Sequence, residues 1–322
     1  MANITTVIPV YNGEKYISET LQSLALQTRQ PDRVIVVDDG SRDRTEEIVR
    51  NFAGIKCEWA PNERNLGLFP NHNSALRFCA ETKFFHILHA DDTISPTFFE
   101  KLIPMIENAP GFAMAFCGYL VVQEDGTPTM QKNAHPGNAP RRFSLREFLR
   151  MQSELKALGL HAVILKTDFK PSPIQFPLDF PQLGDVIFHS QFATHCSELW
   201  GTPEILCQLR SHGAAATTRN MMSLQAFVKD EWRAIQLANQ LLRERGLGGW
   251  THEQKGKLLF AARARVKSDI VKSINPTYAR EIADEAKKTT SFFHWALGSA
   301  VVRLRDTLAP KDDRAKERLK PA

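Results

Sequence analysis

The sequence has few of the features that mark a secreted, membrane-spanning or disulfide-stabilised protein. Its 322 residues include five cysteines, and no two of them form a C-x-x-C pair. An odd number of such cysteines argues against a disulfide framework and against a structural zinc site. No apolar run reaches the roughly 20 residues that a membrane-spanning helix needs, and no signal-peptide pattern precedes the first apolar run. We therefore expect a reduced, cytoplasmic protein.

The chain as a whole also lacks a strong charge of one sign, but its parts do not. The net charge is +5. Residues 221–322 carry 20 Lys and Arg against 12 Asp and Glu, a net charge of +8, whereas residues 1–220 sum to −3. A basic C-terminal third favours an anionic neighbour such as a membrane surface, and a solvated helical surface explains it equally well. No nucleic-acid partner is expected.

Short apolar runs alternate with helical patterns in the first 110 residues. The runs at 5–10, 34–37 and 84–88 are continuous rather than alternating, as buried strands of a parallel sheet require. Helical spacing of apolar residues follows each run, at 14–28, 45–52 and 95–106, with a further helix at 71–81. Repeated strand, loop and helix predict an α/β fold with an open, mostly parallel sheet flanked by helices.

The rest of the chain continues this pattern loosely and then becomes helical. Four prolines between Pro171 and Pro181 exclude regular structure there. Residues 131–142 are expected to form a loop. We place one domain at residues 1–218 and a helical C-terminal region at 219–322. Further strands are expected at 113–122, 161–165 and 204–210, and helices at 144–160 and 186–196.

Two acidic pairs follow the ends of predicted core strands. Asp38 and Asp39 end the second run, and Asp91 and Asp92 come just after the third. In open parallel sheets, ligands bind beyond the carboxyl ends of the strands. Carboxylates accept hydrogen bonds from a base or a ribose, and hard divalent cations share carboxylate oxygens with diphosphate. Each pair alone is explained by a solvated loop carboxylate, but together they predict one cleft for a nucleotide and a cation.

Five motifs follow one another in the first third of the chain: Thr6-Val7-Ile8-Pro9-Val10-Tyr11-Asn12, Leu24-x-x-Gln27-Thr28, Val36-Val37-Asp38-Asp39-Gly40-Ser41, Asn65-Leu66-Gly67-Leu68 and His89-Ala90-Asp91-Asp92. In this order and spacing they resemble a family 2 glycosyltransferase with the Rossmann-like GT-A fold, closely over residues 3–105 and more loosely over 106–215. The resemblance implies a glycosyltransferase that transfers a sugar, with inversion and with a divalent cation, from a nucleotide-diphosphate sugar to a glycan or lipid-linked acceptor hydroxyl. The Gln-x-x-Arg-Trp motif of processive polysaccharide synthases is missing, which favours the transfer of a single sugar.

The donor implied by the resemblance is a UDP-sugar, since uridine is the family's commonest base. The implied reaction would contribute to the synthesis of surface glycans or glycolipids. Tyr11 stands where the family stacks on the base. Asp38 stands where it supports the ribose. His72 stands where the family often has an Arg beside the phosphates, and a surface helix histidine is the alternative. The other positions implied to bind the nucleotide are Pro9, Asp39 and Gly67.

For the cation and the chemistry, the resemblance implies further roles. Asp91 stands at the family's metal-binding acid, and Asp92 and His89 at the donor sugar. His89 replaces the first acid of the D-x-D motif; a histidine can bind Mn²⁺ and is less suited to Mg²⁺, so both cations stay open. Asp185 stands at the catalytic base, although a helix N-terminus also favours a carboxylate. His212 is the expected basic group near the metal and diphosphate, with Arg210 as the second choice and an ordinary loop as the alternative.

Other interpretations concern the end of the chain and the reaction. Residues 291–305 fit an interfacial helix, with the basic tail from Lys311 to Lys320 near anionic headgroups, or a helix packed on the catalytic domain, which such stripes favour slightly. A sugar-nucleotide pyrophosphorylase would need a Gly-rich basic loop where the chain has Tyr11-Asn12-Gly13-Glu14. A degenerate transferase that only binds or scaffolds is favoured by His89.

Overall fold

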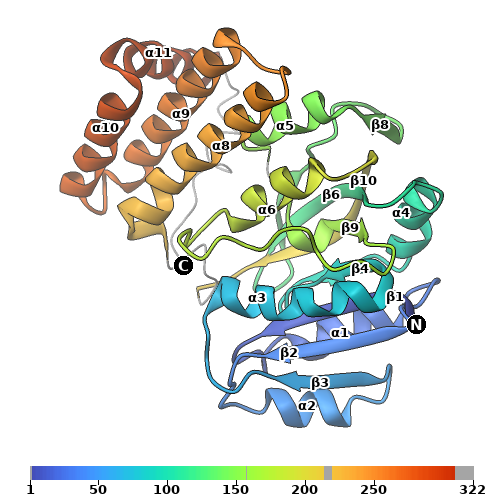
Figure 1. Cartoon of the computed structure of the whole chain (residues 1–322). Helices are drawn as coiled ribbons and strands as arrows, with labels where there is room; N and C mark the ends of the chain where they lie inside the picture. The colour runs from blue at the N-terminus through green and yellow to red at the C-terminus, as the bar shows by residue number, and fades with distance from the viewer. Residues whose placement is uncertain (1, 157, 214–219, 309–322) are drawn as a thin grey trace. The chain divides into compact units, whose positions relative to one another are not determined.

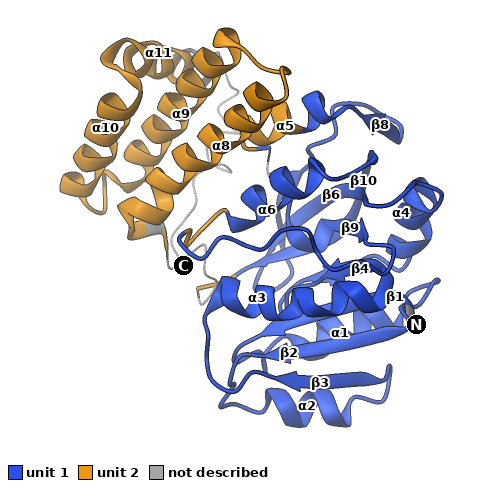
Figure 2. Cartoon of the chain, viewed as in Figure 1, with its two compact units in different colours: residues 1–148, 156–179, 184–211 blue, residues 149–155, 180–183, 212–322 orange. Residues whose placement is uncertain are grey.

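The computed structural model describes residues 2–156, 158–213 and 220–308, which form two compact units (Figure 1, Figure 2). We call them the sheet unit and the helical unit. The sheet unit contains residues 1–148, 156–179 and 184–211, and the helical unit contains residues 149–155, 180–183 and 212–322.

The sheet unit is built on one ten-stranded sheet with the strand order β3-β2-β1-β4-β9-β6-β10-β5, in which β7 pairs with β6 and β8 with β10. The strands are β1 (Ala2–Val10), β2 (Arg33–Asp38), β3 (Cys57–Pro61), β4 (Thr82–Ile87), β5 (Thr93–Ile94), β6 (Ala113–Gln123), β7 (Pro128–Lys132), β8 (Arg141–Phe143), β9 (Val163–Lys166) and β10 (Glu198–Ser211).

The half of the sheet that contains the motifs is parallel, as predicted. β1 pairs in parallel with β2 and β4, and β2 with β3. Ile8 and Val36 are fully buried partners in this register, because both faces of a parallel sheet are covered and the strands must be apolar throughout. In the other half β6 pairs in parallel with β10, whereas β5, β7, β8 and β9 run antiparallel to their neighbours. The sheet is therefore mixed and mostly parallel.

Helices flank this sheet. α3 contacts β1 and β2, and α4 contacts β6, β9 and β10 (Figure 1). Leu21, Leu24 and Phe98 are buried in one core with the strands. The helices are α1 (Ile17–Ala25), α2 (Thr45–Asn51), α3 (Leu68–Leu76), α4 (Phe98–Ile106), α5 (Leu145–Ser153) and α6 (Gly184–Ala193), with the 3₁₀ turns η1 (Arg77–Glu81) and η2 (Leu160–Ala162).

Two local predictions need correction. α5 is shorter than the predicted helix, because Leu155 already has a left-handed φ of 51°. The segment 131–142 is not all loop, since β7 and β8 overlap its two ends.

The helical unit confirms the helical pattern beyond residue 220. Asn275 caps α10 by accepting the N–H of Tyr278 at 3.0 Å, and Pro276 follows it as the first helical residue. No helix within the described residues is long and apolar enough to cross a bilayer. The elements are η3 (Asn220–Met222), the π-helix η4 (Gln225–Lys229), α8 (Asp230–Glu244), α9 (Trp250–Val271), α10 (Pro276–Thr290) and α11 (Phe292–Leu308).

Candidate functional site

The first acidic pair organises the loops at the carboxyl ends of β1 and β2. Asp39 is 2% exposed, and its carboxylate accepts the N–H groups of Leu66 and Gly67, each at 2.8 Å, and the side-chain amide of Asn62 at 2.9 Å. Asp38 accepts the N–H of Ser41 at 3.1 Å. Neither is the solvated loop acid of the alternative interpretation. Asp39 fixes the loop before α3, which includes the Asn-Leu-Gly motif.

The loop that carries Tyr11 is held by the loop after β2. Asn12, at a left-handed φ of 52°, accepts the N–H of Arg42 at 2.9 Å, and Gly13 donates its N–H to the Thr45 hydroxyl at 2.8 Å. The Tyr11 side chain is 51% exposed, whereas Pro9 is buried within β1. A rigid loop thus presents an open aromatic ring at the end of the sheet.

His72 lies in α3 and is 2% exposed, so the surface alternative is wrong. Nδ1 lies 2.7 Å from the Leu68 carbonyl and must donate to it, which makes Nε2 an acceptor. Burial, together with the charge of His89, lowers the pKa of His72 to about 3. A neutral ring with an acceptor nitrogen does not complement a phosphate oxygen. This geometry argues against the phosphate contact that the resemblance implies, and instead places His72 beside His89, with 5.4 Å between ring centroids.

The second acidic pair lies in the loop between β4 and β5. The Thr20 hydroxyl of α1 lies 3.0 Å from the Ala90 carbonyl and 2.9 Å from the Asp92 carbonyl. Asp92 is 2% exposed and accepts the backbone N–H of Arg210 at 2.9 Å. The guanidinium of Arg210 contacts the Asp91 carbonyl at 3.3 Å and pairs with Glu19. Arg210 therefore fixes this loop, and Asp92 is an internal group rather than an open one.

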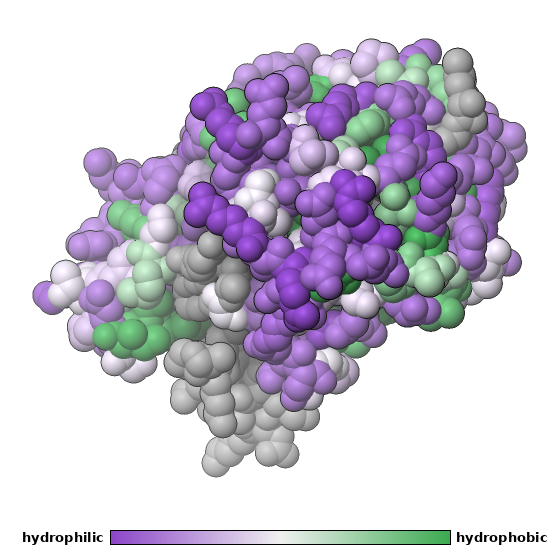
Figure 3. Space-filling model, turned by 90° about the horizontal axis from the view of Figure 1, so that it is seen from below, coloured by the Kyte–Doolittle hydropathy of each residue, from purple (hydrophilic) through white to green (hydrophobic). Residues whose placement is uncertain are grey.

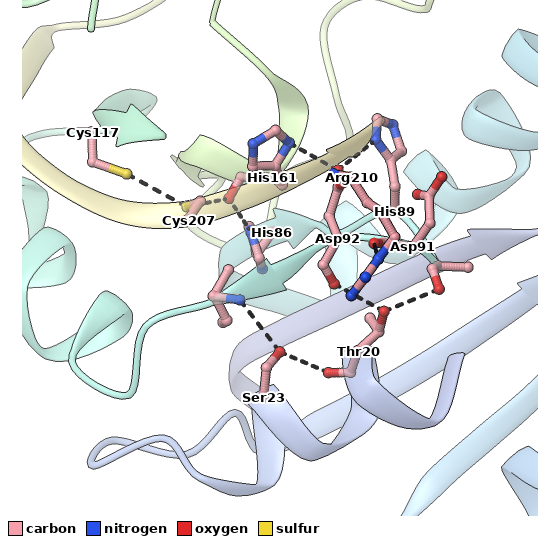
Figure 4. Close-up of polar contacts among 12 residues, drawn as sticks. Thr20, Ser23, His86, His89, Asp91, Asp92, Cys117, His161, Cys207 and Arg210 are labelled. Atoms are coloured by element: carbon pink, nitrogen blue, oxygen red, sulfur yellow. Dashed lines mark hydrogen bonds and ion pairs between the residues drawn. The ribbon is translucent and has the colours of Figure 1, made fainter. Parts of the chain in front are cut away.

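Two histidines lie on opposite sides of the Asp92 carboxylate (Figure 4). Oδ2 of Asp92 is 3.2 Å from Nδ1 of His89 and 3.0 Å from Nδ1 of His161. The second contact is an ion pair and not a hydrogen bond, and among the described residues neither ring nitrogen of the fully buried His161 has a hydrogen-bond partner. We call these three residues the His–Asp–His cluster. The sequence interpretation missed His161, which lies 72 positions from His89 and has no motif around it.

The surroundings of His161 fix its ring. Its carbonyl accepts from Nε2 of His86 at 3.0 Å and from Sγ of Cys207 at 3.2 Å (Figure 4). Tyr119 packs edge-on against the ring, with 4.9 Å between centroids. A Cβ atom at Gly159 would lie 2.4 Å from Cε1 of His161. The glycine two residues earlier is therefore the one local sequence signal for this histidine.

The charges in the cluster stabilise one another. Burial opposes ionisation of Asp92, but the charge of His161 together with the hydrogen bond and the charge of His89 holds the pKa of Asp92 well below its usual range. Burial likewise disfavours a charged His89, yet its hydrogen bond to Asp92 and the charges of Asp92, Asp91 and Asp185 raise the pKa of His89. The cluster therefore carries an ionised carboxylate with imidazole nitrogens around it.

Asp185 is the second residue of α6 and lies in the same electrostatic environment. Gly184 allows the helix start to approach Phe69, because a Cβ there would lie 2.4 Å from the Phe69 ring. Burial raises the pKa of Asp185, and its hydrogen bond with Val186 and the charges of His89 and His161 partly oppose this. The structure thus brings together His72, His89, Asp92 and Asp185, whereas Asp39 contacts the loop before α3.

The remaining expected residues lie differently. The half-buried Asp91 does not belong to the His–Asp–His cluster, and His212 belongs to the helical unit. Among the described residues, this cluster is the one group of three or more His, Cys, Asp or Glu side chains that are close enough to share a cation, with all ligand atoms within 4.8 Å of one another.

The cluster fits a metal site by its donors and their spacing. Ligands about 2.1 Å from a tetrahedral or octahedral cation are separated by roughly 3.0–3.4 Å, and the two contacts of Asp92 are 3.0 and 3.2 Å. A buried imidazole nitrogen without a hydrogen-bond partner is costly unless it binds something. A set of two imidazoles and one carboxylate suits Mn²⁺ or a softer cation better than Mg²⁺.

The chain is similar to known proteins in sequence and in fold. Residues 5–169 match the model of "Glycosyl transferase family 2". A protein of Haemophilus influenzae described as an uncharacterized glycosyltransferase is 34% identical over 218 residues, which are 65% of this chain and 66% of that protein. The chain thus spans slightly less than two thirds of the length of this relative.

Two solved structures share the fold. That of Staphylococcus aureus TarS, residues 1–349 in complex with UDP-GlcNAc, has a TM-score of 0.57 at 17% identity and 90% coverage of both chains. That of the Pyrobaculum calidifontis mannosyltransferase PcManGT with GDP-Man and Mn²⁺ has a TM-score of 0.53 at 15% identity, with coverage of 95% of this chain and 87% of that one. These likenesses confirm the GT-A-type fold with a helical C-terminal region.

Proposed function

Because the chain belongs to glycosyl transferase family 2, we propose that it transfers a single sugar from a nucleotide-diphosphate sugar to an acceptor hydroxyl, with inversion. The observation that supports this most is the His–Asp–His cluster, which lies at the carboxyl end of β4 within the electrostatic range of Asp185. A cation site beside a carboxylate that can accept a proton is what such a transfer requires.

The nucleotide would bind over the loops that follow β1 and β2. Tyr11 offers its exposed ring for stacking on the base. Asp38 and Asp39 contribute mainly by holding the surrounding loops, since their oxygens already accept backbone N–H groups. Gly67, at a φ of 95° with no atom within 4 Å of a Cβ position, leaves open space beside Asp39. A UDP-sugar is the proposed donor, in agreement with the complex of TarS.

The proposed cation is Mn²⁺, held by His89, Asp92 and His161, with Asp91 as the adjoining carboxylate. When bound, such a cation would neutralise negative charge on the leaving nucleotide diphosphate. Asp92 is already ionised and oriented by the backbone N–H of Arg210. The His89 side chain is 33% exposed, whereas that of Asp92 is 2% exposed, so His89 would face the donor sugar as well.

Asp185 would accept the acceptor's proton. The hydroxyl oxygen attacks the anomeric carbon from the face opposite the nucleotide, the bond from that carbon to the phosphate oxygen breaks, and the diphosphate takes the electron pair. A carboxylate is a much weaker base than an alkoxide, so the proton moves late, as the new bond forms. The raised pKa of Asp185 makes it a stronger base than a solvated aspartate.

A donor-release assay tests the proposal. The wild type with Mn²⁺ and a panel of UDP- and GDP-sugars is expected to release nucleoside diphosphate. Asp185→Asn is expected to bind the donor but to release no nucleoside diphosphate when an acceptor is added. Asp125→Asn, in the exposed turn after β6, is the matched control and should behave as the wild type. Donor binding without turnover under all these conditions would instead support the scaffolding function, which His89 in the first acid position favours.

A further inference from the structure

The last described helix exposes a continuous apolar face. α11 buries Trp295 and Val302 on one side, at 9% and 6% exposure. Gly298 lies on the same side, where a Cβ atom would come within 2.8 Å of the backbone nitrogen of Ala262 in α9. Between Phe292 and Val302 the opposite side consists of exposed apolar residues, and the exposed Arg303 follows at its end. The apolar residues are Phe292, Phe293, Ala296, Leu297, Ala300 and Val301.

This face, which we call the α11 apolar face, is unusual for a surface helix. Phe292 and Phe293 are 73% and 69% exposed, and Leu297 and Val301 are 42% and 49% exposed. A packed surface helix normally presents charged residues on its outer side, yet no Asp, Glu, Lys or Arg occurs between Lys288 and Arg303. By contrast, hydrophilic residues dominate the molecular face in Figure 3, and hydrophobic ones form small separate groups there.

A further aromatic residue lies at the same end of the helical unit. His294 contacts Gln254 of α9 through Nε2, at 3.0 Å from Oε1. Trp250 is one helical turn before Gln254 and is 73% exposed. The start of α11 and the start of α9 therefore bring three exposed aromatic side chains to one end of this unit. Aromatic side chains are favoured at the level of lipid headgroups.

The charges next to the α11 apolar face in the sequence favour an anionic partner. Lys287 and Lys288 precede the face and Arg303 follows it, and residues 221–322, which include the basic tail outside the described residues, have a net charge of +8. A second copy docked on the same face would bring two such basic regions together, which is unfavourable. An anionic lipid surface would attract the basic residues and accept the apolar side chains.

We propose that the α11 apolar face binds the surface of an anionic membrane, with Phe292, Phe293 and Leu297 entering the headgroup region and basic residues on either side contacting the lipid phosphates. This inference does not depend on the proposed transfer reaction. It gives the C-terminal third a function that the sheet unit does not require, and it would place the enzyme at the surface where a lipid-linked acceptor is found.

The test is co-sedimentation of the full chain with vesicles. The probes are vesicles of phosphatidylcholine with about 30% phosphatidylserine, and vesicles of pure phosphatidylcholine. The wild type is expected to bind the anionic vesicles, and raising the salt from about 0.1 M to 0.5 M should weaken binding, because the Debye length falls. Phe293→Ser combined with Leu297→Ser is expected to weaken binding about tenfold or more, because the inserted apolar surface is lost.

The matched control is Leu26→Ser combined with Leu178→Ser, which removes exposed leucines from the sheet unit; this variant should bind as the wild type does. Circular dichroism and donor release, which both double variants should retain, separate lost docking from lost folding. The proposal is overturned if the wild type does not bind anionic vesicles, or if the α11 variant binds them as tightly as the wild type. It is equally overturned if light scattering shows a dimer that this variant dissociates while vesicle binding is absent, since the face then joins two copies.

Discussion

Replacing His161 by Gln is the sharpest test of the His–Asp–His cluster. The side chain is fully buried, 3.0 Å from Asp92, and its ring nitrogens have no hydrogen-bond partner in the part of the chain that the structure describes. Gln retains polarity and much of the volume but removes the imidazole ligand. Substitution of a residue that hydrogen-bonds to a metal ligand typically lowers metal affinity about 10–100-fold. Loss of a direct ligand should therefore weaken Mn²⁺ binding by about 100-fold, or about 2.7 kcal/mol.

The same substitution also removes a partner from the ionised Asp92. We expect the free energy of unfolding to fall by about 1–3 kcal/mol, because a buried charge loses part of its compensation. The measurement is Mn²⁺ binding by calorimetry or by electron paramagnetic resonance of the free ion, with no substrate present. His135→Gln is the matched control, since His135 is also a buried histidine with an unpartnered Nε2 but lies outside the cluster. Wild-type Mn²⁺ affinity in His161→Gln, together with its loss in Asp91→Asn, would refute the cluster as the cation site.

Three other substitutions examine neighbouring parts of the site. Asp185→Asn should lower kcat by about 10²–10⁴-fold, with nearly unchanged donor affinity in calorimetry. In the wild type, the transfer rate should fall as the pH drops through the raised pKa of Asp185. A loss of donor affinity in Asp185→Asn as large as its loss of kcat would contradict the role of Asp185 as a base. Tyr11→Ala should weaken nucleotide binding by about 1–3 kcal/mol without changing Mn²⁺ affinity, which titration with UDP measures, and unchanged nucleotide affinity would exclude stacking. Gly159→Ala places a Cβ atom 2.4 Å from the His161 ring, so Mn²⁺ affinity should fall although no ligand is changed; retained affinity would mean that the ring position is unimportant for binding.

The motif-bearing half of the sheet was predictable because its strands must be apolar on both faces. Runs such as Val34–Val37 have this property without any tertiary information, and they correctly located β1, β2 and β4. β9 and β5 are too short, at four and two residues, for a pattern to reveal their antiparallel direction. Their pairing is decided by contacts with β4, β6 and β10, which lie far away in the sequence.

Site residues that lie in a motif of consecutive residues were predictable from the sequence. Site residues that are brought together by tertiary contacts were not. The acidic pairs were found because each ends a strand, but their burial was not, since it depends on donors such as the N–H of Leu66 and of Arg210. His161 was missed because the other two members of the cluster, Asp92 and His89, lie 69 and 72 positions away in the sequence. Gly159 is the one local residue that indicates a large side chain packed against the backbone before His161. This indication is weak, because glycine is also common in turns that have no such neighbour.

The most direct test of the proposed site is anomalous diffraction from crystals of the full chain grown with Mn²⁺ and UDP. We expect a manganese peak at bonding distance from Asp92 and His161, with the uracil stacked on Tyr11. A nucleotide bound at this end of the sheet with its manganese away from the His–Asp–His cluster would contradict the proposed cation site. A nucleotide bound elsewhere on the protein would contradict the proposed donor site itself.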